Sequence, residues 1–196
     1  SWIDCVGHNA GRGIFSRARW SANGSLDGMR HKRKFSVPAD APQFLLNRYH
    51  IKAFNEVFYR LNSLRAGKKQ IHFDKCFYPL DSIGAWNRLY GRRGFYQYQC
   101  VIPKATPNQA VKDILAEIAR SGQASFLAVI KTFGPRASPG YLSFPMAGTN
   151  LALDFPNRGE DTFRLFDRMD QIVSEAGGRI YPAKDGRMPG ALFRTG

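Results

Sequence analysis

The sequence has no long hydrophobic run, and no apolar stretch approaches the ~20 residues that a membrane-spanning helix needs. Hydrophobic residues nevertheless make up 43% of the 196 residues, and aromatic residues make up 13%. A chain of this length and composition can bury one sizeable core, with or without an appendage, and is unlike a disordered segment. Composition therefore predicts a globular domain.

Cysteine is scarce. Cys5, Cys76 and Cys100 are odd in number and widely spaced, so they fit neither a disulfide framework nor a metal-ligand motif. The four histidines are equally scattered, and no two share a helical face at the i, i+4 spacing. We expect reduced, mostly buried thiols, no zinc site and a cytoplasmic protein.

Acidic residues are also few, with 15 Asp and Glu against 29 Lys and Arg, which gives a formal net charge of +14. This excess favours an anionic partner, which could be nucleic acid, an acidic membrane surface or a phosphorylated substrate. The basic residues are densest in the first third, where the run Arg30–Lys34 reads most simply as a solvated loop. No zinc-finger, helix-turn-helix or RNA-recognition signature accompanies the charge, so nucleic acid is the weakest of the three partners.

Common catalytic motifs are absent as well. Gly11-Arg12-Gly13 lacks the third glycine and the strand-turn-helix context of a dinucleotide-binding fingerprint. No Gly-x-Ser-x-Gly elbow occurs. Asp167 and Asp170 have the spacing of a helix surface and do not indicate an acid-base pair.

Hydrophobic periodicity predicts strands in groups that are interrupted by helices. The predicted strands are 2–6, 13–20, 70–78, 95–102, 125–133, 142–144, 150–155 and 179–181. The predicted helices are 47–63, a short helix or turn within 80–90, one that opens with Thr106 as N-cap and Pro107, and 161–176, which ends at Gly177-Gly178. This order favours an α+β fold with a large antiparallel sheet and helices packed on one face. The other face is then free to bind a ligand.

Period-two alternation predicts which side chains lie on that free face. The polar ones are Gln97, Gln99, Lys131, Asn150 and Asp154. Amides donate and accept hydrogen bonds and lysine adds positive charge, so the face suits a hydroxyl-rich or anionic ligand. The pattern alone is equally that of the solvated face of a half-exposed sheet.

Several short sequence motifs occur in a fixed order between residues 70 and 187. They are NRLYGRRG at 87–94, QYQ at 97–99, KTFG at 131–134, LSFP at 142–145, Asn150, DFP at 154–156 and GGRIYPAKD at 177–185. In this order they resemble the cap domain of the decaprenylphosphoryl-β-D-ribose oxidase family, a group of vanillyl-alcohol-oxidase-type flavoenzymes. The first 65 residues resemble this family only loosely.

The resemblance implies an FAD-dependent oxidoreductase that oxidises the 2-hydroxyl of a polyprenylphosphoryl ribose to a ketone, by hydride transfer to the flavin. In this family an N-terminal module binds FAD, and the cap sheet covers the flavin ring. By this comparison residues 1–178 form the cap or substrate-binding domain, and residues 179–196 form a C-terminal segment that returns to the FAD module. Nothing in the chain resembles that module, so we expect the fragment alone to bind no FAD and to be inactive.

The resemblance also implies site residues. Lys184 matches the lysine beside flavin and substrate, and Tyr181 matches an active-site tyrosine. The residues matched to the substrate-binding positions are Gln97, Gln99, Lys131, Phe133 and Asn150. Because lysine can stabilise negative charge on a reduced flavin, we assign Lys184 an electrostatic and positioning role ahead of a general-base role. Ala152 stands where inhibitor-sensitive family members carry a cysteine, so cysteine-directed inhibitors should find no target there.

Two alternatives stay open. The chain could be the cap domain of an FAD-dependent aldonolactone, sugar or polyol oxidase, or a basic, non-enzymatic module that binds nucleic acid or a membrane. An upstream flavin module would exclude the second. If the substrate is a lipid phosphate, the positive charge has a use at an anionic leaflet, and we expect a peripheral location at the inner face of the membrane.

Overall fold

The computed structural model describes residues 1–6, 10–24, 35–78, 80, 83–106, 108–125, 127–137, 139–140, 143–184 and 188–195. Its centre is a six-stranded antiparallel sheet with the order β2-β1-β6-β7-β5-β8. The strands are β1 (Trp2–Ile3), β2 (Gly13–Ile14), β5 (Phe95–Pro103), β6 (Ala128–Phe133), β7 (Gly148–Pro156) and β8 (Arg179–Ile180). The predicted α+β fold with a large antiparallel sheet is confirmed.

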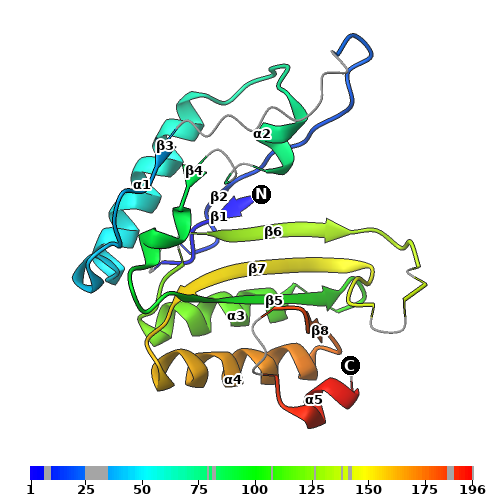
Figure 1. Ribbon diagram of the computed structural model, residues 1–196. Coiled ribbons are helices and arrows are strands. Elements are labelled where there is room, and N and C mark those ends of the chain that lie inside the picture. The colour runs from blue at the N-terminus through cyan, green and yellow to red at the C-terminus, as the bar shows by residue number, and fades with distance from the viewer. Residues whose placement is uncertain are drawn as a thin grey trace.

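Helices lie on both sides of this sheet. They are α1 (Arg48–Leu64), α2 (Phe73–Phe77), α3 (Gln109–Ser121), α4 (Glu160–Glu175) and α5 (Gly190–Thr195). Helices α3 and α4 cover one face, whereas α1 and α2 lie on the opposite side (Figure 1). A separate two-stranded parallel ladder, β3 (Phe35–Ser36) with β4 (Ile83–Gly84), was not predicted.

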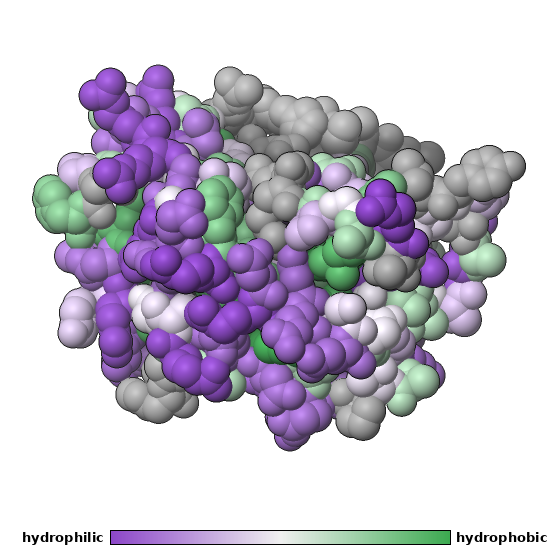
Figure 2. Space-filling model, turned by 90° about the horizontal axis from the view of Figure 1, so that it is seen from below, coloured by the Kyte–Doolittle hydropathy of each residue, from purple (hydrophilic) through white to green (hydrophobic). Residues whose placement is uncertain are grey.

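The main core lies between the sheet and the α3–α4 layer. Alternate residues of β5 and β7 point into it, because side chains along a strand alternate between faces. The predicted apolar faces of α3 and α4 fill the other side. The fully buried residues among these are Cys100, Ile114, Ile118, Leu151, Leu153, Phe155, Leu165 and Met169. The outer surface of this helix layer is mostly hydrophilic (Figure 2), as expected for amphipathic helices that bury one side.

The opposite face of the sheet is less open than predicted. Asn150 and Asp154 of β7 are both 0% exposed. A 3-10 turn at Trp86–Tyr90, within the predicted short helix or turn at 80–90, brings the buried Tyr90 against Phe95 with ring centroids 4.3 Å apart. Phe95 is paired with Pro156 of β7, so the Tyr90 ring lies close to that strand, and burial, followed by the negative charge of Asp154, raises the pKa of Tyr90. Polar residues of this face are therefore partly enclosed, and a fully uncovered face was the wrong expectation.

Helix α1 forms where it was predicted, but its apolar face is only partly buried. The Asn47 side chain caps it by accepting hydrogen bonds from the backbone nitrogens of Tyr49 and His50, at 2.9 and 3.1 Å. Ile51 is buried, whereas Phe54 and Val57 are exposed. The contact of this helix with the sheet depends on other groups as well.

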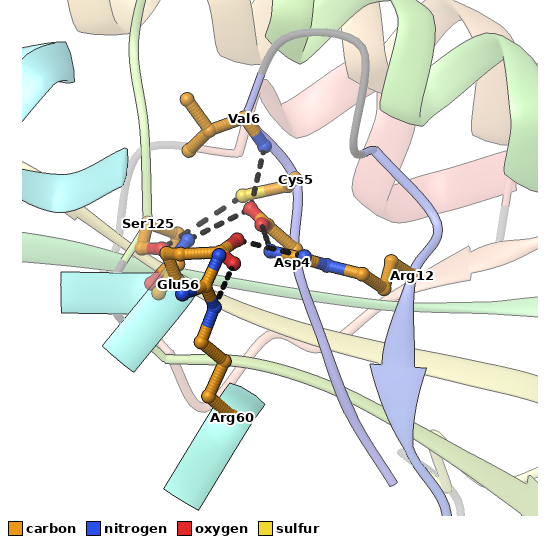
Figure 3. Close-up of polar contacts among 8 residues, drawn as sticks. Asp4, Cys5, Val6, Arg12, Glu56, Arg60 and Ser125 are labelled. Carbon is orange, nitrogen blue, oxygen red and sulfur yellow. Dashed lines mark hydrogen bonds and ion pairs between the residues drawn. The ribbon is translucent and has the colours of Figure 1, made fainter. Parts of the chain in front are cut away.

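A buried carboxylate joins α1 to the first strand. Asp4 accepts hydrogen bonds from Asn55 at 2.8 Å and from the backbone nitrogen of Val6 at 3.0 Å, and pairs with Arg12 at 3.1 Å (Figure 3). Arg12 also pairs with Glu56 of α1 at 2.8 Å. These bonds compensate the desolvation of Asp4, which is 0% exposed, and no sequence pattern indicated them.

Some predicted elements are wrong or displaced. Residues 70–78 were predicted as a strand, but they contain α2, because Phe73 and Phe77 also satisfy the i, i+4 period of a helix. The Thr106 hydroxyl does not cap α3. It donates to the carbonyl oxygen of Ala176 at 2.9 Å, and Asn108 precedes the helix instead.

Other differences concern the ends of elements. The strands predicted at 2–6 and 13–20 are reduced to two residues each, and the C-terminal tail contains α5. Ser143 and Phe144 belong to no strand. Four features used in the predictions lie outside the described residues: the run Arg30–Lys34, Pro107, Leu142 and Asp185.

Two glycines place the last strand against the sheet. Gly177 ends α4 with φ +66°, the left-handed conformation that glycine adopts without strain, as predicted. A Cβ atom on Gly178 would lie 2.5 Å from the carbonyl oxygen of Val101, so only glycine allows this approach to β5. Tyr181 then follows β8 directly, and its backbone nitrogen donates to the Gln99 carbonyl oxygen at 2.8 Å.

Candidate functional site

Strand register brings three of the predicted site residues onto one face. Lys131 of β6 is paired with Asn150 of β7, and Asn150 is paired with Val101 of β5. Directly opposed residues in antiparallel strands project to the same side. Gln99 is two residues from Val101, so it shares that side. Gln99, Lys131 and Asn150 therefore lie on the face away from α3 and α4.

Hydrogen bonds between neighbouring strands orient the amides. Gln99 Nε2 donates to Asn150 Oδ1 at 3.3 Å, and Asn150 Nδ2 donates to the Cys100 carbonyl oxygen at 2.9 Å. Gln97 Nε2 donates to Asp154 Oδ1 at 2.8 Å. The buried side chains of Asn150 and Asp154 thus hold the half-buried amides of Gln99 and Gln97 in place.

The first hollow beside these glutamines is mainly aromatic and has a volume of about 460 Å³. It is lined by Gln99, Phe133, Gly140, Ser143, Phe144, Pro145 and Tyr181. The rings of Phe144 and Tyr181 stack with centroids 4.7 Å apart, and Phe133 meets Phe144 edge-on at 6.1 Å. A hollow with aromatic walls and one amide suits a ligand that has both an apolar face and hydroxyl groups.

The second hollow, of about 260 Å³, contains the predicted catalytic residues. Its lining includes Gln97, Gln99, Tyr181, Lys184, Met188 and Phe193. Lys184 Nζ lies 5.6 Å from the centroid of the Tyr181 ring, within the range of a cation-π contact. Gln99 and Tyr181 border both hollows.

The structure does not gather every predicted residue equally. Gln97, Gln99, Phe133, Tyr181 and Lys184 line one or both hollows. Asn150 is buried on the neighbouring strand, hydrogen-bonded to Gln99. Lys131 is exposed on the same face but lines neither hollow.

Sequence reasoning missed several lining residues. Phe144 and Pro145 lie in the motif at 142–145, which is part of the resemblance, but no role was predicted for either residue. Met188 and Phe193 lie in a tail whose polar, glycine-rich composition carried no signal. The helix that carries Phe193 brings it to the hollow, and this could not be read from a local pattern.

Two features are absent from the residues that the structure describes: a metal-ligand cluster and a helix able to cross a membrane. Among these residues, no group of three or more His, Cys, Asp or Glu is placed to hold a metal ion. Within the same ranges, no helix has the length and hydrophobicity to cross a membrane.

Comparisons with known proteins agree with the resemblance seen in the sequence. No family model matches the chain. The chain is 35% identical over 208 residues to decaprenylphosphoryl-beta-D-ribose oxidase of Mycolicibacterium smegmatis, an alignment that covers 100% of this chain and 44% of that protein. It is also 34% identical over 95 residues to an uncharacterized protein in the mprA 5' region of Streptomyces coelicolor, covering 48% of the chain and 25% of that protein.

The chain therefore spans less than half the length of the curated relatives that it matches. The resemblance predicted from the sequence words is confirmed. It extends over the whole chain, including the first 65 residues, where only a loose resemblance was expected.

Proposed function

We propose that this chain is the substrate-binding cap region of an FAD-dependent oxidoreductase that oxidises a sugar hydroxyl to a ketone. The proposed substrate is a polyprenylphosphoryl ribose, oxidised at its 2-hydroxyl. The proposal is carried by one combination: similarity over the whole chain to an oxidase of that name, together with amides, a lysine and aromatic rings at two hollows that share Gln99 and Tyr181. On this proposal the FAD-binding module lies in the part of the protein that this chain does not include.

The residues around Lys184 fit the edge of a flavin ring. The second hollow combines the Lys184 ammonium group with the Tyr181 ring and the amides of Gln97 and Gln99. Such donors complement the carbonyl oxygens and the developing negative charge of an isoalloxazine edge. When bound, FAD would supply the acceptor for the hydride. A hollow of about 260 Å³ holds only a small part of such a cofactor, so the remainder would have to be bound elsewhere.

The residues of the chain would bind and orient the sugar. Gln99, held by Asn150, presents a fixed amide to the sugar hydroxyls, and the stacked rings of Phe144 and Tyr181 pack against its apolar face and exclude water. Lys131 projects from the same face and supplies positive charge for the phosphate. The hydroxyl proton must leave to solvent as the C–H bond breaks, and the Lys184 ammonium group, which cannot itself accept that proton, would stabilise the negative charge that develops on the oxygen and on the flavin.

The test uses the complete protein that contains this chain, purified with FAD and mixed anaerobically with candidate substrates. We expect a short-chain polyprenylphosphoryl ribose to bleach the flavin absorbance. Lys184→Ala should slow this reduction by about 100-fold, since it removes a charge at the reacting centre. Lys112→Ala, which removes an exposed lysine on α3, is the matched control and should leave the rate unchanged.

Two results would count against the proposal. A complete protein that neither contains nor takes up FAD would remove its basis. Faster reduction by a free aldonolactone, sugar or polyol than by the lipid-linked ribose would keep the oxidase and replace the substrate.

A further inference from the structure

Exposed aromatic side chains occur in two segments that lie side by side although they are distant in the sequence. Phe15 and Trp20, in the loop after β2, are 80% and 82% exposed, and Phe77 of α2 is 60% exposed. The rings of Trp20 and Phe77 lie 6.1 Å apart, although more than 50 residues separate them in the chain. Gln70 Nε2 also donates to Ser21 Oγ at 3.1 Å, which joins the same two segments.

Basic residues accompany these rings. Arg17 and Arg19 lie between Phe15 and Trp20, and both are exposed. The second segment, residues 65–78, adds Arg65, Lys68, Lys69 and Lys75, all of which are exposed. Residues 15–24 and 65–78 together contain these six basic residues and one acidic residue, Asp74. The rings and charges together are called here the basic aromatic surface.

From this geometry we propose that the basic aromatic surface docks the protein onto an anionic lipid bilayer. Tryptophan and tyrosine settle at the headgroup level of a bilayer, and phenylalanine enters the adjoining hydrocarbon. Arginine and lysine beside them are attracted to anionic headgroups within a Debye length. The positive charge of the surface is thus complementary to a negatively charged leaflet.

A lipid surface fits these residues better than a nucleic acid does. Single-stranded nucleic acids also use aromatic rings and positive charge, but each base needs a ring face on which to stack. Here the aliphatic side chain of Ile71, within the second basic segment, is 44% exposed. Such a side chain gains free energy by entering hydrocarbon and gains little from a base. Nucleic-acid binding is therefore the competing outcome of the test.

The position of this surface determines how a docked bilayer would lie relative to the sheet. Helix α2 and the loop after β2 lie beyond the β1–β2 edge of the sheet, away from α3 and α4 (Figure 1). A bilayer that contacts Trp20 and Phe77 would therefore lie beyond this edge, away from α3 and α4. The docking proposal goes beyond the proposed function and does not depend on it.

The experiment is vesicle flotation with the full chain, together with any further sequence that its gene encodes. Vesicles contain neutral phosphatidylcholine alone or with about 30 mol% phosphatidylglycerol as the anionic lipid. We expect binding to the anionic vesicles and its loss on raising the salt to about 0.5 M. Trp20→Ser with Phe77→Ser, and separately Arg17→Gln with Arg19→Gln, should each weaken binding by about ten-fold or more.

Matched controls remove the same kinds of side chain elsewhere. Tyr49→Ser removes another exposed aromatic ring, and Lys52→Gln with Lys112→Gln removes two exposed charges. Neither control should alter vesicle binding. Circular dichroism checks that each variant is folded, and the arginine variant tests the proposal even if the aromatic one does not fold.

Three outcomes would overturn the proposal. The first is no binding of the parent protein to anionic vesicles at low salt. The second is binding that the controls weaken as much as the designed variants do. The third is binding to a single-stranded oligonucleotide that depends on Trp20 and Arg17 while vesicle binding does not.

Discussion

Gln99 on β5 donates a hydrogen bond from Nε2 to Oδ1 of Asn150 on β7, across 3.3 Å. Asn150 in turn donates to the Cys100 carbonyl oxygen at 2.9 Å, and it is 0% exposed. The Asn150 amide is therefore a buried structural group, whereas the Gln99 amide lies at the surface of the candidate site. A change at Asn150 should act on the site through the orientation of Gln99.

Asn150→Leu should lower the free energy of unfolding by about 1–3 kcal/mol, because it leaves the Cys100 carbonyl oxygen and the Gln99 amide without their partner. Urea unfolding measures this loss. Gln99→Leu is the matched control, and it should cost less because this side chain is only half buried. Equal losses in the two variants would contradict the division into a buried support and a site residue.

Tyr98→Phe should also destabilise the protein by about 1–3 kcal/mol. The Tyr98 hydroxyl donates to Asp170 Oδ1 at 2.9 Å between the sheet and α4, where both residues are buried. Removing the hydroxyl takes a hydrogen bond from a buried carboxylate. Tyr49→Phe removes the same atom from an exposed ring and should be neutral by the same urea titration. A neutral Tyr98→Phe would show that other groups satisfy Asp170.

Thiol labelling should distinguish Cys76 from the other two cysteines. Cys76 is exposed, whereas Cys5 and Cys100 are fully buried. Burial raises the pKa of Cys5 to about 12 and also raises the pKa of Cys100, so neither forms thiolate near neutral pH. At about pH 8 the native protein should react rapidly with one equivalent of a thiol reagent. Cys76→Ser should abolish this rapid phase, and a persisting rapid phase would mean that a buried cysteine becomes accessible.

Acid should weaken the attachment of α1 to the first strands. Hydrogen bonds from Arg12, and then from Arg60, lower the pKa of Glu56 below its usual value of about 4.3. The stabilisation from Glu56 is thus complete above the unfolded pKa and is lost as the pH falls through the lower, folded one. A double-mutant cycle with Arg12→Gln and Glu56→Gln should give a favourable coupling at about pH 7 that disappears well below the folded pKa. A coupling that stays constant with pH would exclude this ion pair as its source.

Residues with a strong local period were predicted well. The apolar positions of α3 and α4, the alternation along β5 and β7, and the end of α4 at Gly177 all agree with the structure. In these segments one repeating pattern meets a buried surface, so local sequence and tertiary packing favour the same conformation. The face on which Gln97, Gln99, Lys131 and Asn150 lie follows from the same alternation.

Short segments were predicted less well. The run at 70–78 fits both a strand and a helical turn, and its residues 73–77 form α2. The apolar residues predicted along α1 are largely exposed, because the helix is joined to the sheet edge through Asp4, Asn55 and Arg12 as well as through Ile51. Local periodicity carries no information about such long-range polar contacts.

Residue spacing within single elements was enough to predict the antiparallel sheet, the two helices that pack on it and the common face of the site amides. Tertiary structure alone decided that Asn150 would be buried, that Phe144 and Phe193 would line the hollows, and that Lys131 would stay outside them. Those outcomes depend on strand register and on the packing of distant loops. Register and packing are set by the whole fold, because contacts far apart in the chain must be satisfied together.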